Sequence, residues 1–488
     1  MTRISFHDTT LRDGHQCLWA TRMSTPMMLP VIDAMDRAGF DVLEIMGAVQ
    51  FDTCVRFLNE NPWQRLRTLC GRIRRTTRQA IIRSKCALSF ELQPDDINRL
   101  WVELLIKNGI ERIIAFDGLH DLDNIEDALR HAKQLGAWTE GWLIFSISPV
   151  HTDAFYATVA RGFIDRCGVD ALMIEDTSGI LTPERAKTLI PAIKREIGGM
   201  RLGLHTHNLA GLAQLAYIEA AGLGVDNLYT CIAPIADGNA PPAIQTTVNN
   251  LRHLGFEDSI DDAKIAEIAS YFKALAIQEG KPLGRPHDYD AAIFEHQIPG
   301  GVMSNLASQL ESAGHGDKLQ AVLDECGTVR EELGWPIQVT PFSQFIGVQA
   351  TLNVTAGERY ARVPDAVKKY ALGYYGKTMA PVDPNVLDRI VENGSRAIAI
   401  VPPAPEPALP GLRKAYPGAG DEELMLRHAF PAAAVDAVLG GTGNAQDYSR
   451  LGTPLVELVR SLVLRPNIKT VNLQTTDTRI EFRRNAAG

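Results

Sequence analysis

The sequence has no excess of positive charge, no long apolar run and no closely spaced cysteine pair, and each absence argues against a class of protein. Its 49 Lys and Arg against 58 Asp and Glu give a formal net charge of −9, which argues against nucleic acid or an anionic membrane as partner. The sequence contains no run of about 18 apolar residues, so it predicts no membrane span. Its N-terminus resembles a strand more than a signal peptide. The seven cysteines are scattered without a C-x-x-C pair, which favours reduced thiols and a cytoplasmic location.

What remains is a globular composition of 488 residues, 45% hydrophobic and 22% charged, long enough for two or three domains. Short β-branched or apolar runs alternate with helix-period segments through the first 250 residues. The eight expected strands are Ile4–Asp8, Val42–Met46, Ala80–Arg83, Arg112–Asp117, Trp142–Ser148, Ala171–Asp176, Leu202–His207 and Leu228–Ile232. Repeated alternation of this kind predicts an α/β fold, a TIM (β/α)8 barrel, over residues 1–300.

Beyond residue 300 the strands give way to helical patterns. We expect a mainly helical domain over residues 301–400 and a small C-terminal α/β extension over residues 401–488. The extension opens with a proline-rich linker, Val401–Pro410. Five later segments carry a clear period: Leu319–Leu333, Pro364–Leu372 and Asp421–Phe430 as helices, and Thr470–Gln474 and Thr478–Arg483 as strands.

The most informative feature is the loop Asp8–Gln16, which follows the first expected strand and reads Asp-Thr-Thr-Leu-Arg-Asp-Gly-His-Gln. Burying charged groups together is costly unless they are paired or bind a metal ion. Much later in the chain, His205 and His207 stand two residues apart on a strand-like run. Side chains with this spacing point to the same side of a strand. Asp13, His205 and His207 are therefore candidate ligands of one metal ion.

Further polar residues stand at or after the ends of expected strands: Arg83 ends the third, Asp117 ends the fourth, Glu175 stands at the end of the sixth, and Asn239 follows the eighth. Catalytic groups of TIM barrels come from the carboxyl ends of the strands. We therefore expect these side chains to meet Asp13 at one mouth of the barrel, although they are far apart in the sequence.

Several stretches carry a family resemblance: Asp8–Gln16, Ala20–Met23, Phe57–Trp63, Ser148–Thr152, Gln297–Gly301, Ser304–Leu306 and Val339–Pro341. Through them, residues 4 to about 380 resemble the carboxyltransferase subunits and domains of biotin-dependent enzymes, such as pyruvate carboxylase, oxaloacetate decarboxylase and the transcarboxylase between methylmalonyl-CoA and pyruvate. The resemblance implies a metal-dependent enzyme that acts through the enolate of a pyruvate- or oxaloacetate-like 2-oxo acid, and a homo-oligomer, commonly a dimer. No Met-Lys-Met acceptor is present, so biotin would arrive on a separate carrier.

The resemblance also implies roles for individual residues. In that family the positions of Asp13, His205 and His207 hold the metal, together with a carbamylated lysine. Arg12, Gln16 and Arg83 match positions that handle the carboxylate and the enolate of the substrate. The mix of nitrogen and oxygen ligands favours Mn²⁺ or Zn²⁺ over Mg²⁺.

This chain departs from the family at the chemistry itself. Glu175 stands at the lysine position, Asn239 at the position of a proton-transferring threonine, and Phe90 where a tyrosine is expected. The segment around Asn239, Gly-Asn-Ala, resembles the isopropylmalate synthase and hydroxymethylglutaryl-CoA lyase barrels, in which an asparagine completes the metal site. Asn239 is thus a candidate fourth ligand and substrate contact, although a plain turn residue would fit Asp-Gly-Asn as well. Glu175 is a candidate catalytic residue, either as a direct ligand or as a group that orients one.

Three functions remain open on the sequence. The leading hypothesis is a divergent carboxyltransferase subunit, which the length and the helical domain favour. The alternative is a biotin-independent lyase, synthase or decarboxylase that makes or breaks a C–C bond, which Glu175 and Asn239 favour. A non-catalytic scaffold is the third, and the intact Arg12 and Arg83 argue against it, because a scaffold has no need of them.

Overall fold

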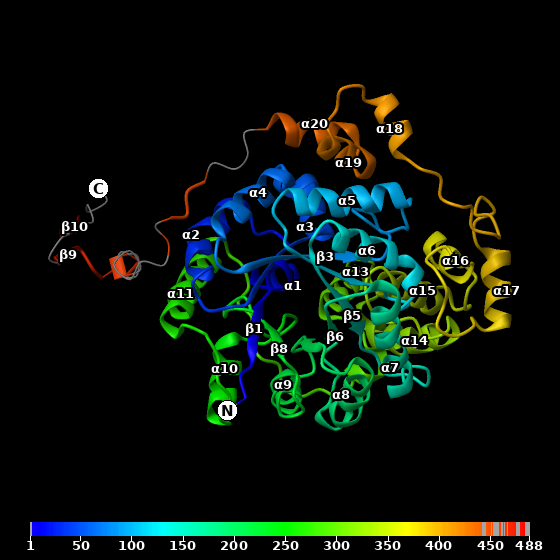
Figure 1. Ribbon diagram of the computed structural model, residues 1–488, viewed down its shortest axis with the longest axis horizontal. Helices are drawn as coiled ribbons and strands as arrows, with labels where there is room; N and C mark the ends of the chain where they lie inside the picture. The colour runs from blue at the N-terminus through cyan, green and yellow to red at the C-terminus, as the bar shows by residue number, and fades with distance from the viewer. Residues whose placement is uncertain are drawn as a thin grey trace.

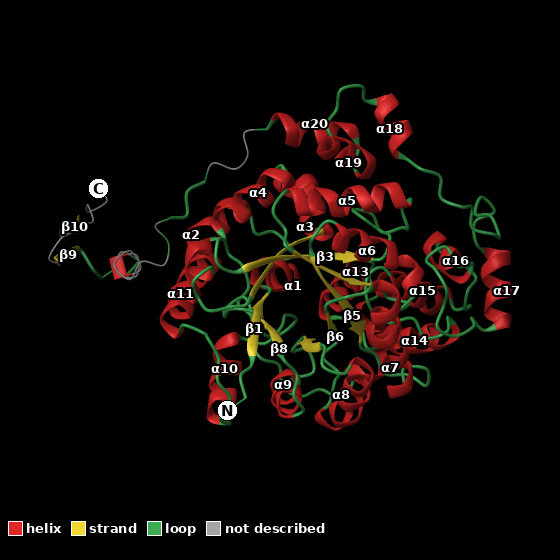
Figure 2. Cartoon of the chain, in the orientation of Figure 1, coloured by secondary structure: helices red, strands yellow, loops and turns green. Residues whose placement is uncertain are grey.

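The computed structural model describes residues 2–441, 446–449, 451, 458–459, 462, 464–465, 467–474 and 479–483. At its centre is a closed barrel of eight parallel strands, in which each strand pairs with the next and β8 pairs with β1 (Figures 1 and 2). The strands are β1 (Ser5–Asp8), β2 (Val42–Gly47), β3 (Thr77–Arg83), β4 (Arg112–Phe116), β5 (Trp138–Ile144), β6 (Ala171–Asp176), β7 (Arg201–Thr206) and β8 (Asn227–Thr230). The predicted TIM barrel is confirmed.

Helices surround this barrel, and their apolar faces pack on the strands. They are α1 (His15–Trp19), α2 (Thr25–Met35), α3 (Ala48–Thr53), α4 (Pro62–Arg72), α5 (Asp95–Lys107), α6 (Glu126–Gln134), α7 (Asp153–Gly162), α8 (Pro183–Ile197), α9 (Ala213–Gly222), α10 (Ile244–His253) and α11 (Asp262–Gln278). Helix α4 illustrates the local rules: Asn61 accepts hydrogen bonds from the first backbone amides, and Pro62 occupies the first helical position.

One strand lies earlier than the sequence indicates. We predicted Trp142–Ser148, but β5 runs from Trp138 to Ile144; the bounds of the other barrel strands differ from prediction by at most three residues. The reason is Glu140, a fully buried acid that pairs with Arg112 inside the barrel and accepts a hydrogen bond of 2.7 Å from Trp142 Nε1. An ion pair in the barrel interior makes the first half of the strand look like a polar loop.

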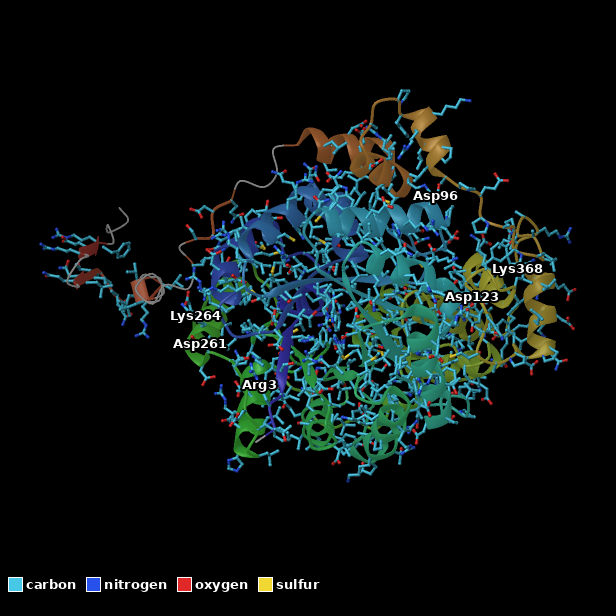
Figure 3. The ribbon with its side chains drawn as sticks, in the orientation of Figure 1. Arg3, Asp96, Asp123, Asp261, Lys264 and Lys368 are labelled. Carbon is cyan, nitrogen blue, oxygen red and sulfur yellow. The ribbon has the colours of Figure 1, made fainter. Side chains whose placement is uncertain are left out.

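The next part of the chain is helical and shares a core with the barrel. Its helices are α12 (Ile293–His296), α13 (Gly300–Ser312), α14 (Leu319–Glu332), α15 (Phe342–Ala356), α16 (Asp365–Ala371) and α17 (Pro384–Asn393). Phe116 at the end of β4 belongs to the same buried cluster as Phe342 and Phe345 of α15. A Cβ at Gly118 would lie 2.6 Å from the Phe342 ring, so the helical part packs tightly against the loop after β4. Lys368, labelled in Figure 3, is buried and donates to the Val391 carbonyl near the end of α17.

The C-terminal part adds three helices, α18 (Leu409–Ala415), α19 (Asp421–Ala429) and α20 (Ala432–Gly440), where we predicted only the middle one. They lie over α4 and α5 (Figure 1). Helix α18 begins inside the predicted linker, because proline is compatible with a first helical turn, and its Leu409 amide donates to Asp96, labelled in Figure 3.

The chain's last strands, β9 (Thr470–Gln474) and β10 (Arg479–Arg483), pair antiparallel as a two-stranded sheet. Thr478, the predicted start of the second strand, lies outside the described residues. Within the described part of the chain, no helix has both the length and the apolar character that crossing a membrane requires.

Candidate metal and substrate site

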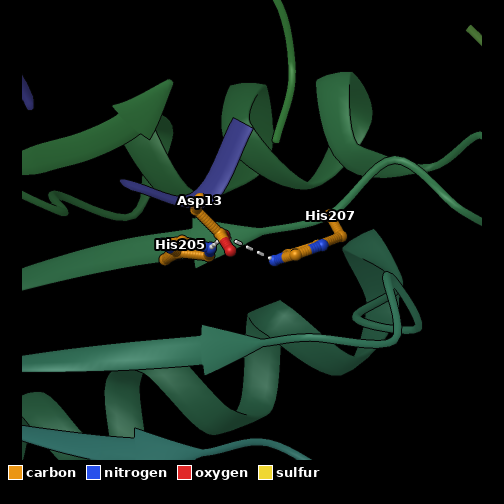
Figure 4. Close-up of side chains that lie close together, drawn as sticks. All are labelled: Asp13, His205 and His207. Atoms are coloured by element: carbon orange, nitrogen blue, oxygen red, sulfur yellow. Dashed lines mark ion pairs between the residues drawn. The ribbon is translucent and has the colours of Figure 1, made fainter. Parts of the chain in front are cut away.

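Asp13 and the two histidines meet at the carboxyl-terminal mouth of the barrel. Asp13 lies in a π-helical turn, Thr10–Gly14, directly after β1, whereas His205 lies on β7 and His207 just beyond it. Asp13 Oδ2 is 3.2 Å from His205 Nε2 and 3.0 Å from His207 Nε2 (Figure 4). One ligand atom from each residue lies within 4.8 Å of the others, and all three side chains are buried. The structure thus brings together the three residues that we predicted to share a metal ion.

The protonation states of Asp13, His205 and His207 decide whether these residues can bind a cation. Burial lowers the pKa of His205 to about 4, against the opposing effect of Asp13, so its imidazole is neutral at neutral pH. Burial also acts to lower the pKa of His207, but Asp13 outweighs it and raises the pKa. Burial acts to raise the pKa of Asp13, yet Arg12 and His207 hold it well below its usual range. A carboxylate that faces two imidazole nitrogens is a donor set suited to a divalent cation.

Neighbouring groups orient these candidate ligands. The Asn239 carbonyl lies 2.7 Å from His207 Nδ1 and accepts a hydrogen bond from it, which leaves Nε2 facing Asp13. Asp13 Oδ1 lies 2.9 Å from Arg12 Nη1 and 3.5 Å from Cys17 Sγ, so the other oxygen, Oδ2, stays directed at the histidines. Contacts of this kind set the tautomer and direction of metal ligands.

Several contacts fix the position of the Arg12 side chain beside Asp13. Its Nε lies 3.0 Å from Glu44 Oε1 on β2, and Thr9 donates to the other Glu44 oxygen at 2.6 Å. Gln50 donates to the Arg12 carbonyl at 2.8 Å. Burial raises the pKa of Glu44, and the attraction of Arg12 only partly offsets that rise. The guanidinium is therefore buried between two carboxylates, Glu44 and Asp13.

Glu175 lies near Arg12 and Asp13, but its Oε2 makes no hydrogen bond to the described residues. It lies on β6, in register with His205 on β7, and its Oε2 has no hydrogen-bond partner among the described residues. Burial raises the pKa of Glu175 well above its usual range; Arg12 opposes the rise, and Asp13 and Glu44 add to it. A buried carboxyl with an open oxygen beside a candidate cation site can either bind the ion or hold a proton.

The other predicted residues lie around the mouth. Arg83, at the end of β3, donates from Nη2 to the Ser89 carbonyl at 2.7 Å, and its guanidinium carbon lies 4.9 Å from the centre of the half-exposed Phe90 ring. Its Nε is buried without a partner among the described residues. Gln16 is half-buried and accepts a hydrogen bond of 3.3 Å from Gln50.

The helical part closes one side of the mouth. Gln297, between α12 and α13, accepts hydrogen bonds from Ser146 and from the Ile147 amide, so it ties the loop after β5 in place. A Cβ at Gly300 would lie 2.2 Å from Asn239 Oδ1, so the start of α13 packs directly on the Asn239 side chain.

Three residues of the site escaped the sequence reasoning: Cys17, Glu44 and Gln50. Glu44 stands inside an apolar strand segment, Val42–Met46, and a lone acid in such a run was the available signal. Cys17 follows the recognised loop directly, whereas nothing in the sequence distinguishes Gln50.

Comparison with known proteins agrees with this architecture. Residues 293–452 match the family model of the conserved carboxylase domain, and residues 111–271 match the HMGL-like model. The chain is 36% identical to a pyruvate carboxylase subunit from Methanocaldococcus jannaschii, over 90% of this chain and 78% of that protein. The chain therefore belongs to the carboxyltransferase family of biotin-dependent carboxylases, as the motifs predicted, and is a carboxyltransferase-like enzyme.

Within that family it is also 32% identical to the methylmalonyl-CoA carboxyltransferase 5S subunit of Propionibacterium freudenreichii subsp. shermanii, over 88% of this chain and 86% of that protein. The carboxyl transferase domain of Rhizobium etli pyruvate carboxylase, solved with pyruvate, superposes with a TM-score of 0.82 at 24% identity, over 90% of this chain and 78% of that chain. At this identity the superposition establishes the fold alone.

Proposed function

We propose that this enzyme transfers a carboxyl group between biotin, carried by a separate protein, and a pyruvate- or oxaloacetate-like 2-oxo acid. The observation that carries the proposal is the contact of one Asp13 oxygen with both His205 Nε2 and His207 Nε2. Family membership and relatives named for pyruvate and methylmalonyl-CoA carboxylation support the substrate class. The homo-oligomer and the separate biotin carrier rest on the resemblance alone.

The residues present fit a divalent cation. Asp13 Oδ2, His205 Nε2 and His207 Nε2 are buried and face one another across short distances, which is an arrangement suited to ligands of one cation. Mn²⁺ or Zn²⁺ suits this mix of nitrogen and oxygen donors better than Mg²⁺. A bound cation would act as a Lewis acid that polarises the keto oxygen of the substrate.

The protein's own groups would do the rest. Arg12, fixed by Glu44, presents its guanidinium at the mouth, where negative charge develops on the enolate oxygen. Arg83 offers a buried Nε without a partner among the described residues, so it can hold the substrate carboxylate. Gln16 lies beside Gln50 at the same mouth and can add an amide contact to the substrate.

Glu175 and Asn239, the two residues that depart from the family pattern, also receive proposed roles. We propose that Glu175 acts indirectly, by orienting a ligand or a bound water, because its side chain reaches less far than the carbamylated lysine of the family and its Oε2 has no partner among the described residues. For Asn239 we propose two contributions. Its carbonyl accepts a hydrogen bond from His207. Its side-chain oxygen faces Gly300 at the start of α13, and the side chain would turn from there to complete the ligand set or contact the substrate.

Metal content tests the site directly. Asp13→Ala and His207→Ala should lose bound metal and any enolate-forming activity, whereas His253→Ala, an exposed histidine on α10, should retain both. Enolate formation is followed by NMR as exchange of the pyruvate methyl protons for deuterium. Full metal occupancy in both site variants would refute the assignment of the ligands.

The biotin-independent lyase, synthase or decarboxylase remains the second candidate, because Glu175 and Asn239 occupy positions where the family uses lysine and threonine. A positioned proton-transfer group contributes about 10²–10⁴-fold, so biotin-dependent transfer should be slow. Rapid biocytin-stimulated decarboxylation of oxaloacetate would show that the transfer chemistry is intact and would support the proposed carboxyltransferase over this alternative. Proton exchange without stimulation by biocytin would favour the lyase-like enzyme, and neither activity would favour a scaffold. Glu175→Lys should raise biocytin-dependent activity if the rest of the pocket still serves transcarboxylation.

A further inference from the structure

A cavity of about 660 Å³ opens at the end of the barrel opposite the metal site. Five of its lining residues are the first residues of their strands: Val42 of β2, Thr77 of β3, Arg112 of β4, Trp138 of β5 and Arg201 of β7. The metal site lies beyond the carboxyl ends of β1 and β7, so this cavity lies at the amino-terminal mouth. Nothing in the proposed reaction uses it, and its volume falls within the usual range of small-molecule sites.

Two residues of the cavity lining, His7 and Arg112, each have a buried donor without a partner among the described residues. Asn227 Nδ2 donates to His7 Nδ1 at 3.4 Å, so the proton of the neutral His7 ring lies on Nε2, which has no hydrogen-bond partner among the described residues. Arg112 pairs through Nη2 with Glu140, but its Nε is likewise without a partner there. His7 is only 1% exposed and Arg112 only 6%. Buried donors are nearly always paired, so His7 and Arg112 keep hydrogen-bonding capacity that the described residues do not use.

The acids at the edge of the cavity do not supply an acceptor for these donors. Glu111 lies 2.6 Å from Arg78, and Asp170 lies 2.8 Å from Lys133. Arg78 and Lys133 lie outside the cavity lining. These two carboxylates are therefore neutralised from outside the cavity.

The remaining charges leave the cavity positive. Arg201 donates to Ser5 Oγ at 2.9 Å but approaches the Asp41 carboxylate only to 3.9 Å, with its side chain 48% exposed. The Arg75 guanidinium has no ion pair among the described residues. Among the described residues, Arg75 and Arg201 thus stand against a single remaining carboxylate of the lining, Asp41. Guanidinium groups bind oxyanions with paired, charge-assisted hydrogen bonds.

We propose that the amino-terminal cavity binds a small oxyanion, a phosphate or a carboxylate compound, through the guanidinium groups of Arg75 and Arg201. Residues at this end of a TIM barrel usually serve stability. A purely structural cluster would, however, balance its charges and pair its donors within the protein, whereas this lining keeps surplus positive charge and two donors without a partner among the described residues.

The sequence offers a matched pair of variants for the test. Arg75 lines the cavity, whereas its neighbour Arg74 is also exposed but does not. The full-length, metal-loaded protein is titrated with inorganic phosphate by calorimetry, with sodium chloride holding the ionic strength constant. Wild type and Arg74→Gln should bind phosphate with the same Kd, and Arg75→Gln and Arg201→Gln should each raise the Kd about tenfold or more, the usual effect of losing one charge-assisted hydrogen bond.

Malonate, titrated in the same way, distinguishes the two kinds of oxyanion, and the tighter ligand identifies the class. Binding to the metal site would be unchanged in Arg75→Gln and Arg201→Gln, so equal affinity in these variants and wild type would overturn the proposal. Absence of binding of both anions to wild type would overturn it as well. Circular dichroism of each variant confirms that a weaker affinity does not reflect unfolding.

Discussion

Replacing Glu44 by glutamine tests whether the reaction requires Arg12 in a fixed position. Arg12 Nε and Glu44 Oε1 lie 3.0 Å apart, with side chains 6% and 0% exposed. Removing one partner of a buried ion pair destabilises a protein by about 3–5 kcal/mol. Arg12 keeps Asp13 at 2.9 Å, so we expect a loss at the lower end of that range.

The effect on activity should be larger than the effect on binding. Displacement of a catalytic group by about 1 Å can reduce the rate about 10²-fold. Because Arg12 is proposed to act on charge that develops in the transition state, Glu44→Gln should lower kcat about 10²-fold with little change in KM. The exchange of pyruvate methyl protons, followed by NMR on metal-loaded protein, measures both constants.

A matched control separates this effect from simple destabilisation. Glu60→Gln breaks a second buried ion pair, in which Arg65 of α4 lies 2.6 Å from Glu60 in the preceding loop, with side chains 1% and 6% exposed. Urea unfolding followed by circular dichroism should show a comparable loss of stability, yet kcat should stay unchanged under conditions where the variant is folded. Equal loss of kcat in both variants, or full activity of Glu44→Gln, would refute the positioning role of Glu44.

Three further perturbations have defined outcomes. Gly300→Ala places a Cβ 2.2 Å from Asn239 Oδ1, so it should shift the start of α13 and lower the metal affinity, measured by chelator competition. An unchanged affinity would show that the position of α13 does not affect the metal site. Burial raises the pKa of Asp8 to about 7 against its hydrogen bonds from Thr10, so the native state holds this proton more tightly than the unfolded chain does. This contribution to stability is complete below pH 4 and is lost as the pH rises to 7, by up to about 1.4 kcal/mol per pH unit; Asp8→Asn should flatten that slope in urea unfolding at several pH values. Removing the metal with a chelator should lower Tm, because a ligand at about 1,000 times its Kd stabilises the native state by about 4 kcal/mol, and an unchanged Tm would contradict a bound ion.

Local patterns in the sequence were sufficient for the barrel and for the three central residues of the site. Strand and helix periods are properties of neighbouring residues, so eight strand–helix units could be recognised without any tertiary contact. The spacing of His205 and His207 likewise fixes that both side chains leave the strand on the same side. Asp13 could be added because it belongs to a recognisable loop at the end of a strand.

The partners of these residues depended on the closed barrel. Glu44 becomes the partner of Arg12 only because β1 and β2 pair in one register, and the Asn239 carbonyl reaches His207 only after β8 returns beside β7. Glu140 misled the placement of β5 because its partner Arg112 stands on another strand.

The amino-terminal cavity is the extreme case of this dependence. It combines residues from the starts of strands throughout the barrel, and none of them has an unusual local context. A sequence pattern describes the faces of one element, whereas the sum of charges and unpaired donors at a site arises from strands that meet only when the barrel closes. Contacts between residues distant in the chain are set by strand register and barrel closure, and no pattern among neighbouring residues specifies either.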